Sequence, residues 1–364
     1  MDSHLYHIPC NYSEIFDEQV CMFMIKRNTS LLDKLKTSKN KINNQKNWDV
    51  AKKFANKYEF IFSFNNDGVA DIIPISRSYF KLVEILKDNV ILEHKDDVVK
   101  AACLCEGPGG FIQAINDVYH SKHIQPIDCI TLMSTDKKIP NWKLNSINNY
   151  KISYGKDRTG NLYDVDNIHH FVDVVGKNSC NLVTADGGFD FSKDFNSQED
   201  NFLLLLLCEI YTCLNIQSEG GTFVLKVFDL FHEDTLNFVS LLRMFYETII
   251  IQKPKTSRPA NSEKYIICKN FSNNNAAVLP YVKDKIYNKQ SFIGDVINKH
   301  LQYDTLKYIV NYNDTFVVAQ MYHIEKTLHL IKTNHFNKKE NLRYCIEWCR
   351  SYGIPIKHVF KSLI

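Results

Sequence analysis

The chain has 364 residues, of which 45% are hydrophobic and 23% are charged, and its formal net charge is +3. These values are ordinary for a soluble globular protein and leave enough chain for one large domain or two smaller ones. A net charge this small neither requires nor rules out nucleic acid, so any basic binding surface must be local.

The cysteines and the apolar segments argue against several classes of protein. The 11 cysteines include no Cys-x-x-Cys pair, and Cys103/Cys105 and Cys345/Cys349 lack histidines at zinc-site spacing. We therefore expect a reduced, intracellular protein, cytoplasmic with the nucleus as the alternative. The polar start Met1–His4 is unlike a signal peptide. The run Phe202–Leu207 is too short to span a bilayer, and Glu209 closes it, so we expect a buried helix and no membrane partner.

The first part of the chain has a helical pattern from about residue 15 to residue 60. A lysine-rich run lies within it, made of Lys34, Lys36, Lys39, Lys41, Lys46, Lys52, Lys53 and Lys57. Such a run is most simply a solvated face, and contact with an RNA backbone is the alternative. Ser76 is a plausible N-cap for a helix over Arg77–Leu86.

A strand, a glycine-rich turn and a helix follow. Val98–Cys105 is typical of a buried strand, Glu106–Gly110 of a tight turn, and Phe111–Ile115 of the start of a helix. Glycines at the carboxyl end of a strand let a ligand approach the backbone beside the helix amino terminus. The spacing is not G-x-G-x-x-G, which disfavours a nicotinamide cofactor, and by itself the turn could be only a tight connection.

The middle of the chain alternates strands with helices, which predicts an α/β fold with a parallel sheet between two helical layers. The expected strands are Ile127–Met133, Asn181–Ala185, Gly220–Asp229, Thr248–Ile251 and Tyr265–Cys268, and the expected helices are Glu199–Gln217 and Asp234–Phe245. The last two strands are joined by a connection too short for a helix, so they should form an antiparallel hairpin at or near the sheet edge. This order is the doubly wound, Rossmann-like sheet of S-adenosylmethionine-dependent methyltransferases, with an antiparallel terminal strand.

Charged residues converge at one edge of this predicted sheet. Lys226 interrupts an apolar strand, and because a buried cation is costly it should be neutral, paired or at a cleft edge, unless it simply emerges into solvent. Asp186 ends another strand, and Glu263 begins the antiparallel one. Strand ends of this kind meet at the ligand-binding edge of an open α/β sheet, and Lys81 on a preceding helix could reach the same place.

Five segments together resemble a known family. They are Ser76-Arg77-Ser78-Tyr79-Phe80-Lys81-Leu82, Gly107-Pro108-Gly109-Gly110-Phe111, Thr184-Ala185-Asp186-Gly187-Gly188, Leu225-Lys226-Val227-Phe228-Asp229 and Ser257-Arg258-Pro259-Ala260-Asn261-Ser262-Glu263-Lys264-Tyr265. In this order they resemble the FtsJ/RrmJ-type ribose 2′-O-methyltransferases, and most of all the mRNA cap-1 enzymes, including those of large DNA viruses. The resemblance covers roughly residues 76–271.

The resemblance implies an S-adenosylmethionine-dependent enzyme that needs no metal and carries a Lys-Asp-Lys-Glu tetrad. Its members map onto Lys81, Asp186, Lys226 and Glu263. Lys226 would be the general base, because a lysine desolvated beside a second cation can lose its proton near neutral pH. Lys81 would be that cation and steady the developing oxyanion, Asp186 would orient Lys226, and Glu263 would hold Lys81 or the ribose.

The same resemblance implies the cofactor contacts, and basic residues placed beside the tetrad predict contacts with RNA. The implied cofactor-binding residues are Cys105, Glu106, Gly107, Pro108, Gly109, Gly110, Phe111, Asp157 and Asp186, and the predicted RNA-binding residues are Arg77, Lys253, Lys255, Arg258 and Ser262. The chain has Cys103 where relatives commonly begin the cofactor motif with an acid, so the partner of the methionine ammonium stays open. The predicted partners are a capped mRNA 5′ end and other capping or transcription proteins, but not DNA.

We therefore predict a methyltransferase domain at residues 71–271 between a helical N-terminal extension, 1–70, and a helical C-terminal extension, 272–364. The predicted activity is mRNA cap ribose 2′-O-methylation, which converts cap-0 to cap-1. A viral protein of this kind would act in a viral factory or virion. Two alternatives stay open: methylation of ribosomal or transfer RNA, and a catalytically inactive RNA-binding capping subunit. An inactive subunit would usually lack a tetrad member, and none is missing here.

Overall fold

The computed structural model describes residues 5–9, 17–43, 45–63, 67–93, 98–136, 139–188 and 196–361. The strands are β1 (Leu5–Pro9), β2 (Val98–Val99), β3 (Ala101–Leu104), β4 (His123–Ile124), β5 (Ile127–Ile130), β6 (Tyr150–Ser153), β7 (Cys180–Ala185), β8 (Gln217–Val227), β9 (Tyr246–Gln252) and β10 (Lys264–Phe271). The helices are α1 (Glu18–Asn40), α2 (Trp48–Ala55), α3 (Ser78–Asp88), α4 (Gly110–Val118), α5 (Val165–Val175), α6 (Gln198–Ile216), α7 (Glu233–Phe245), α8 (Leu279–Tyr287), α9 (Lys299–Thr333), α10 (Lys338–Ser351) and α11 (His358–Lys361). None of the described helices is both long and apolar enough to cross a membrane.

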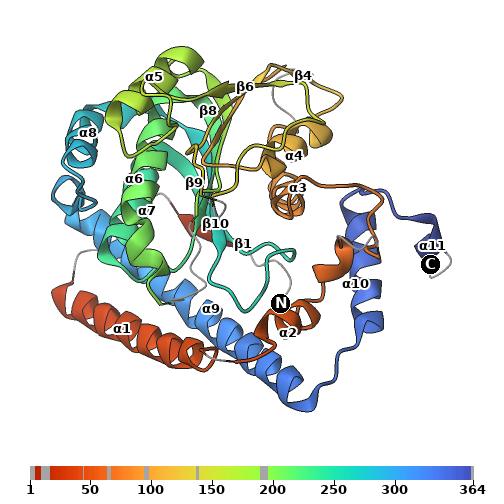
Figure 1. The fold of residues 1–364 in the computed structure, drawn as a ribbon. Coiled ribbons are helices and arrows are strands. Elements are labelled where there is room, and N and C mark those ends of the chain that lie inside the picture. Colours follow the sequence, from red (N-terminus) through yellow and green to blue (C-terminus); the bar gives the residue numbers. More distant parts are fainter. Residues whose placement is uncertain are drawn as a thin grey trace.

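The main sheet has eight strands in the order β1-β9-β10-β8-β7-β3-β5-β6. Strands β8, β7, β3, β5 and β6 pair in parallel, and β10 is antiparallel to both β8 and β9. Helices α5, α6 and α7 cover one face of the sheet, and α3 and α4 cover the other (Figure 1). The predicted doubly wound sheet with an antiparallel strand near its end is confirmed.

Strand β8 lies in the middle of this sheet, between β10 and β7. Its side chains Phe223, Val224 and Leu225 are completely buried, and they point alternately into the two helical layers. The leucine-rich run on α6 is also buried, because this helix packs under β7 and β8. Burial on both faces is what makes the position of Lys226, one residue before the end of β8, unusual.

Two edge strands were not predicted. Strand β1 pairs antiparallel with β9, so the predicted β9–β10 hairpin is covered by a further strand from the first 70 residues. Strand β6 pairs in parallel with β5, in a stretch where no strand was predicted. Both strands have mostly exposed or half-buried side chains, so they lack the apolar run that identifies an inner strand. The division at residues 70 and 271 stays a prediction.

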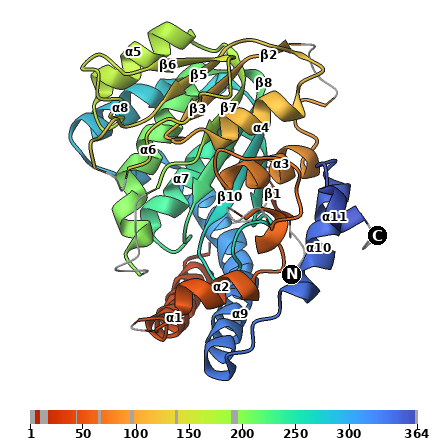
Figure 2. The ribbon, with the colours of Figure 1, turned by 45° about the vertical axis from the view of Figure 1, so that its right-hand side comes forward.

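The long helices α1 and α9 lie side by side below the sheet (Figures 1 and 2). Their contact includes a hydrogen bond from Asn313 to Asn28 at 3.0 Å and the apolar packing of Leu35 against Val317. Most of the lysine-rich run is exposed or half-buried, but Lys39 is only 4% exposed and its Nζ lies 2.7 Å from Asp229. The prediction of a solvated face is therefore wrong for Lys39, because α1 turns this side chain toward the loop that follows β8.

Candidate active site

Two ion pairs meet where the strands of the sheet end. Asp186 directly follows β7, and the Nζ of Lys226 lies 3.2 Å from its Oδ1 and donates to its backbone oxygen at 2.7 Å. Glu263 directly precedes β10, and the Nζ of Lys81, on α3, lies 2.7 Å from its Oε1. Elements far apart in sequence thus bring the four predicted tetrad residues to one edge.

The carboxylates of both pairs are held by further hydrogen bonds. The hydroxyl of Tyr265 donates to Asp186 Oδ1 at 2.9 Å, and the hydroxyl of Ser257 donates to Glu263 Oε1 at 2.7 Å. Tyr265 and Ser257 are themselves buried. Acceptors fixed in this way keep the two lysine side chains in defined positions, which a site for group transfer requires.

The electrostatics of the site correct one expectation. Burial by itself would lower the pKa of Lys226, but the carboxylates of Asp186 and Glu263 outweigh it, and the pKa rises above its usual 10.5. Burial would likewise raise the pKa of Glu263, but Lys81 and Lys226 hold it at about 2. Lys226 is therefore a cation in this structure, and desolvation does not free its base form near neutral pH, because two carboxylates stabilise the ammonium.

The glycine-rich turn joins β3 to α4 at the same edge. Glu106 Oε1 accepts a hydrogen bond from the backbone nitrogen of Phe111 at 2.7 Å, so this carboxyl group caps the amino terminus of α4. A Cβ at Gly110 would lie 2.3 Å from the hydroxyl oxygens of Ser76 and Ser78, so only glycine lets the turn approach the start of α3 this closely. The turn thus links the cofactor motif to the helix that carries Lys81.

A second buried carboxyl group, Glu209, lies beneath this turn. A Cβ on Gly187 would be 2.3 Å from Glu209 Oε1 and 3.2 Å from the Cβ of Cys105, so Glu209 contacts the loop that follows Asp186. Burial raises the pKa of Glu209 to about 8 and that of Glu106 well above its usual range. Hydrogen bonds from backbone N–H groups and, for Glu209, from the Cys105 thiol oppose this rise in pKa, but burial outweighs them. Buried acids of this kind are suited to a ligand that carries positive charge.

Sequence reasoning missed Glu209, although a lone carboxylate within an apolar run was a signal. From the sequence, Glu209 was interpreted only as the end of the leucine-rich segment.

The loop that contains Asp157 follows β6 at the same end of the sheet. The Asp157 carboxylate accepts from the backbone nitrogen and the hydroxyl of Thr159, at 2.9 and 2.8 Å. A Cβ on Gly160 would lie 2.0 Å from the backbone oxygen of Thr131, which places this loop against the end of β5. The predicted cofactor residues therefore lie at the ends of neighbouring strands, while Asp157 itself is exposed and bound within its own turn.

Two of the predicted RNA-binding side chains share one carboxylate. Arg258 Nη2 lies 2.8 Å from Glu59 Oε1, and Arg77 Nη2 lies 3.3 Å from Glu59 Oε2. Their side chains keep 31% and 24% of their surface exposed. Lys255 is half-buried at the start of the same loop. Contact of these three cations with RNA stays a prediction.

The other two predicted RNA-binding side chains have internal partners. The Nζ of Lys253 donates to Asn261 Oδ1 and to the backbone oxygen of Glu263, both at 2.6 Å. Ser262 is 1% exposed, and its hydroxyl accepts from Gln320 on α9 at 3.1 Å. In this structure the loop folds back on itself and uses both side chains to hold its own shape, and their contact with RNA stays a prediction.

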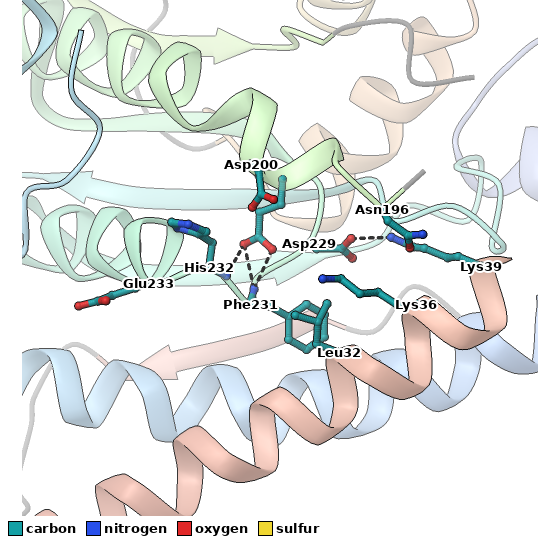
Figure 3. Close-up of a pocket in the computed structure, with 10 residues that line it drawn as sticks. Leu32, Lys36, Lys39, Asn196, Asp200, Asp229, Phe231, His232 and Glu233 are labelled. Atoms are coloured by element: carbon teal, nitrogen blue, oxygen red, sulfur yellow. Dashed lines mark hydrogen bonds and ion pairs between the residues drawn. The ribbon is translucent and has the colours of Figure 1, made fainter. Parts of the chain in front are cut away.

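A cavity of 320 Å³ lies beside the loop that follows β8 (Figure 3). It is lined by Leu32, Lys36, Lys39, Asn196, Glu199, Asp200, Asp229, Phe231, His232 and Glu233. Glu199 accepts hydrogen bonds from the backbone nitrogens of Phe231 and His232, at 2.9 and 2.8 Å, and so fixes the aromatic ring in the wall. Across the described residues, no group of three or more histidine, cysteine or carboxylate side chains is placed to hold a metal ion.

Comparison with known proteins decides the family. The model of the FtsJ-like methyltransferase family matches residues 74–271, which is more than half of the chain. The chain belongs to the FtsJ-like methyltransferases. Among relatives of this methyltransferase is the cap-specific mRNA (nucleoside-2′-O-)-methyltransferase of Autographa californica nuclear polyhedrosis virus. It is 32% identical over 198 residues, which cover 53% of this chain and 71% of the viral protein.

Two nematode relatives are similar over more of the methyltransferase chain. Cap-specific mRNA (nucleoside-2′-O-)-methyltransferase 1A of Caenorhabditis briggsae is 30% identical over 313 residues, which cover 79% of this chain and 34% of that protein. The inactive cap-specific mRNA (nucleoside-2′-O-)-methyltransferase 1B of the same species is 29% identical over the same length and is covered to 35%. The chain thus spans about a third of the length of these two relatives.

Proposed function

We propose that this methyltransferase transfers a methyl group from S-adenosylmethionine to the ribose 2′-hydroxyl of the first transcribed nucleotide of capped mRNA. The observation that carries the proposal is the arrangement of Lys226 with Asp186 and Lys81 with Glu263 at the edge where the glycine-rich turn also ends. Relatives named for cap-specific 2′-O-methylation support the choice of substrate. Other capping or transcription proteins remain predicted partners.

The residues of the glycine-rich turn, with Asp157 and Asp186, would hold the cofactor. The buried acids Glu106 and Glu209 fit its positive charges, because both can ionise beside a cation. When bound, S-adenosylmethionine supplies an electrophilic methyl group on a sulfonium, whose positive charge disfavours a protonated lysine nearby. The leaving group is already activated, so the proposed reaction needs no metal.

Lys226 would take the proton of the ribose hydroxyl through its amine form. Asp186 holds the Lys226 nitrogen at the end of β8, and the apolar strand around it excludes water. Lys81, kept in place by Glu263, would stabilise the charge that develops on the attacking oxygen. Fixed orientation of these side chains supplies much of the expected acceleration.

The cavity beside Phe231 is suited to the cap itself. A 7-methylguanine base is an aromatic cation, and such groups bind to aromatic faces and carboxylates. Phe231 supplies the ring, Asp200 and Glu233 supply exposed carboxylates, and Lys36 lies where a phosphate chain could bind (Figure 3). Asp229 connects this cavity to the tetrad, because it lies three residues beyond Lys226.

The test offers capped RNA, the same RNA with a 5′-triphosphate, and ribosomal RNA, each with labelled cofactor. Nuclease digestion and mass spectrometry then locate the methyl group. We expect label only on the first ribose of the capped RNA, and none with the Lys226→Ala variant, which should still bind the cofactor. Methylation of ribosomal RNA alone would show the ribosomal alternative, and binding of RNA without transfer would show an inactive subunit.

A further inference from the structure

Glu84 lies one helical turn beyond Lys81 on α3, and its side chain is completely buried. Its Oε1 accepts from the backbone nitrogen of Lys255 at 2.5 Å, and its Oε2 accepts from the backbone nitrogen of Thr256 at 3.2 Å. These two residues lie near the start of the loop 253–263 that leads from β9 to β10. One carboxyl group therefore ties the helix of the first tetrad lysine to the loop that ends at the tetrad glutamate.

A third element reaches the same carboxyl group. The indole Nε1 of Trp348, on α10, donates to Glu84 Oε2 at 3.2 Å. Trp348 is 2% exposed, and its ring packs edge-on against Phe80 with the centroids 5.7 Å apart. Phe80 directly precedes Lys81. Helix α10 belongs to the last part of the chain and lies near α2 and α3 (Figures 1 and 2).

The hydrogen-bond chemistry of this contact favours a charged carboxylate. Four donors point at Glu84: two backbone N–H groups, the indole N–H of Trp348 and the hydroxyl of Thr256, which lies 3.2 Å from Oε2. An ionised carboxyl group only accepts, so all four donors are satisfied at once. Burial raises the pKa of Glu84 to about 7, and these donors keep it from rising further.

We propose that Glu84 is a positioning residue for the ion pair between Lys81 and Glu263, and that Trp348 makes helix α10 part of the active site. The pair bridges α3 and the loop 253–263, so any shift of the loop moves one partner relative to the other. A misplacement of about 1 Å in a catalytic group can lower a rate about a hundredfold. The inference rests on the proposed function because it concerns two tetrad residues.

Three variants separate positioning from general stability. Glu84→Gln keeps the size of the side chain but turns an N–H₂ group toward N–H donors. Trp348→Phe removes one donor and keeps the ring against Phe80. Asp88→Asn is the matched control, because Asp88 also joins α3 to α10 and β9, accepting from the Tyr352 hydroxyl at 2.7 Å and from Gln252 at 2.9 Å, but it contacts neither Lys255 nor Thr256.

We expect Glu84→Gln to lower kcat about ten- to a hundredfold and Trp348→Phe about three- to tenfold. Cofactor binding should change less than twofold in both, since Glu84 does not contact the glycine-rich turn. Asp88→Asn should lower the thermal midpoint and leave kcat within twofold. Losses in the double variant Glu84→Gln/Trp348→Phe should be less than additive, because both changes act on one contact.

Hydrogen exchange gives a readout that does not depend on any RNA. The backbone N–H groups of Lys255 and Thr256 should exchange about tenfold faster in Glu84→Gln than in the wild type, and at the wild-type rate in Asp88→Asn. A failure of the proposed function would leave this result intact. Unchanged exchange at Lys255 and Thr256 in both Glu84→Gln and Trp348→Phe would overturn the proposal. A loss of kcat in Asp88→Asn as large as that in Glu84→Gln would also overturn it. If Glu84→Gln does not fold, Trp348→Phe carries the same two measurements.

Discussion

Lys226 is the residue whose protonation should control the rate of methyl transfer. Its pKa lies above the usual 10.5, because Asp186 and Glu263 outweigh the effect of burial. At pH 7.5 the neutral form then amounts to about one part in a thousand or less. If this neutral form is the general base, the single-turnover rate should rise about tenfold per pH unit between pH 6.5 and pH 8.5. The pH at which the rise stops reports the pKa in the complex with cofactor and RNA.

The size of the effect can be worked from the Asp186–Lys226 pair. Opposite charges 3.2 Å apart attract by about 5 kcal/mol at an effective dielectric constant of about 20. Part of this attraction offsets the cost of burying both groups, and the remainder holds the proton on Lys226. Asp186→Asn removes the attraction, so its pH–rate curve should level off at a lower pH than that of the wild type, even if its maximum rate is lower.

The assay is a single-turnover methyl transfer to capped RNA with saturating labelled cofactor, quenched at intervals at each pH. Circular dichroism at each pH shows that the protein remains folded, and Lys226→Ala gives the background at every pH. A rate that is independent of pH from 6.5 to 8.5 would refute the reasoning. Lys226 would then act as a permanent cation that stabilises the developing oxyanion, and the hydroxyl proton would leave by another route.

Four further predictions concern charge and recognition. The pKa of Glu263 is about 2 against the usual 4.5, which stabilises the fold by about 3 kcal/mol above pH 4.5, and this stabilisation is lost as the pH falls from 4.5 to 2. In Glu263→Gln, denaturant titration at pH 7 should show the same loss of stability. Lys39→Met should lower the free energy of unfolding by about 3 kcal/mol in the same titration, since it leaves Asp229 buried beside fewer cations. The double variant Lys39→Met/Asp229→Asn should lower it by less. Phe231→Ala should weaken binding of capped RNA about tenfold in a fluorescence titration, and leave uncapped RNA unchanged. Cofactor binding at pH 7 should release protons, because the positive charge of the cofactor favours ionisation of Glu209, whose pKa is about 8. The binding enthalpy measured by calorimetry should then depend on the ionisation enthalpy of the buffer, and this dependence should be smaller in Glu209→Gln.

The sequence predicted the inner strands and the tetrad well because these residues obey strong local rules. Strands β3, β7 and β8 are apolar runs that end in glycine, aspartate or lysine, so their ends could be placed and their charged residues assigned to one edge. The edge strands β1 and β6 were missed because one side of each faces solvent, which removes the apolar run. Pairing with a neighbour, rather than composition, decides such strands.

The side-chain contacts within the loop 253–263 were harder to predict from the sequence than the tetrad. Lys253 and Ser262 lie on a basic, polar loop beside Glu263, and this position favoured contact with RNA. In the structure Lys253 binds Asn261 and the backbone of Glu263, and Ser262 binds Gln320. These partners depend on how the loop folds back and on where α9 packs. The same holds for the lysine-rich run, because the burial of Lys39 depends on how α1 packs and not on the sequence around it.

The direction of β10 explains how the fold and the chemistry depend on each other. Parallel strands bring residues at or just beyond their carboxyl ends to the ligand edge, as β8 does for Lys226 and β7 for Asp186. An antiparallel strand brings the residue that precedes it, which is how Glu263 reaches the same edge. The register pairs Tyr265 with Lys226, and the Tyr265 hydroxyl binds Asp186. A slip of one residue in this register would turn Tyr265 to the other face of the sheet, so the β8–β10 pairing sets the geometry of both ion pairs.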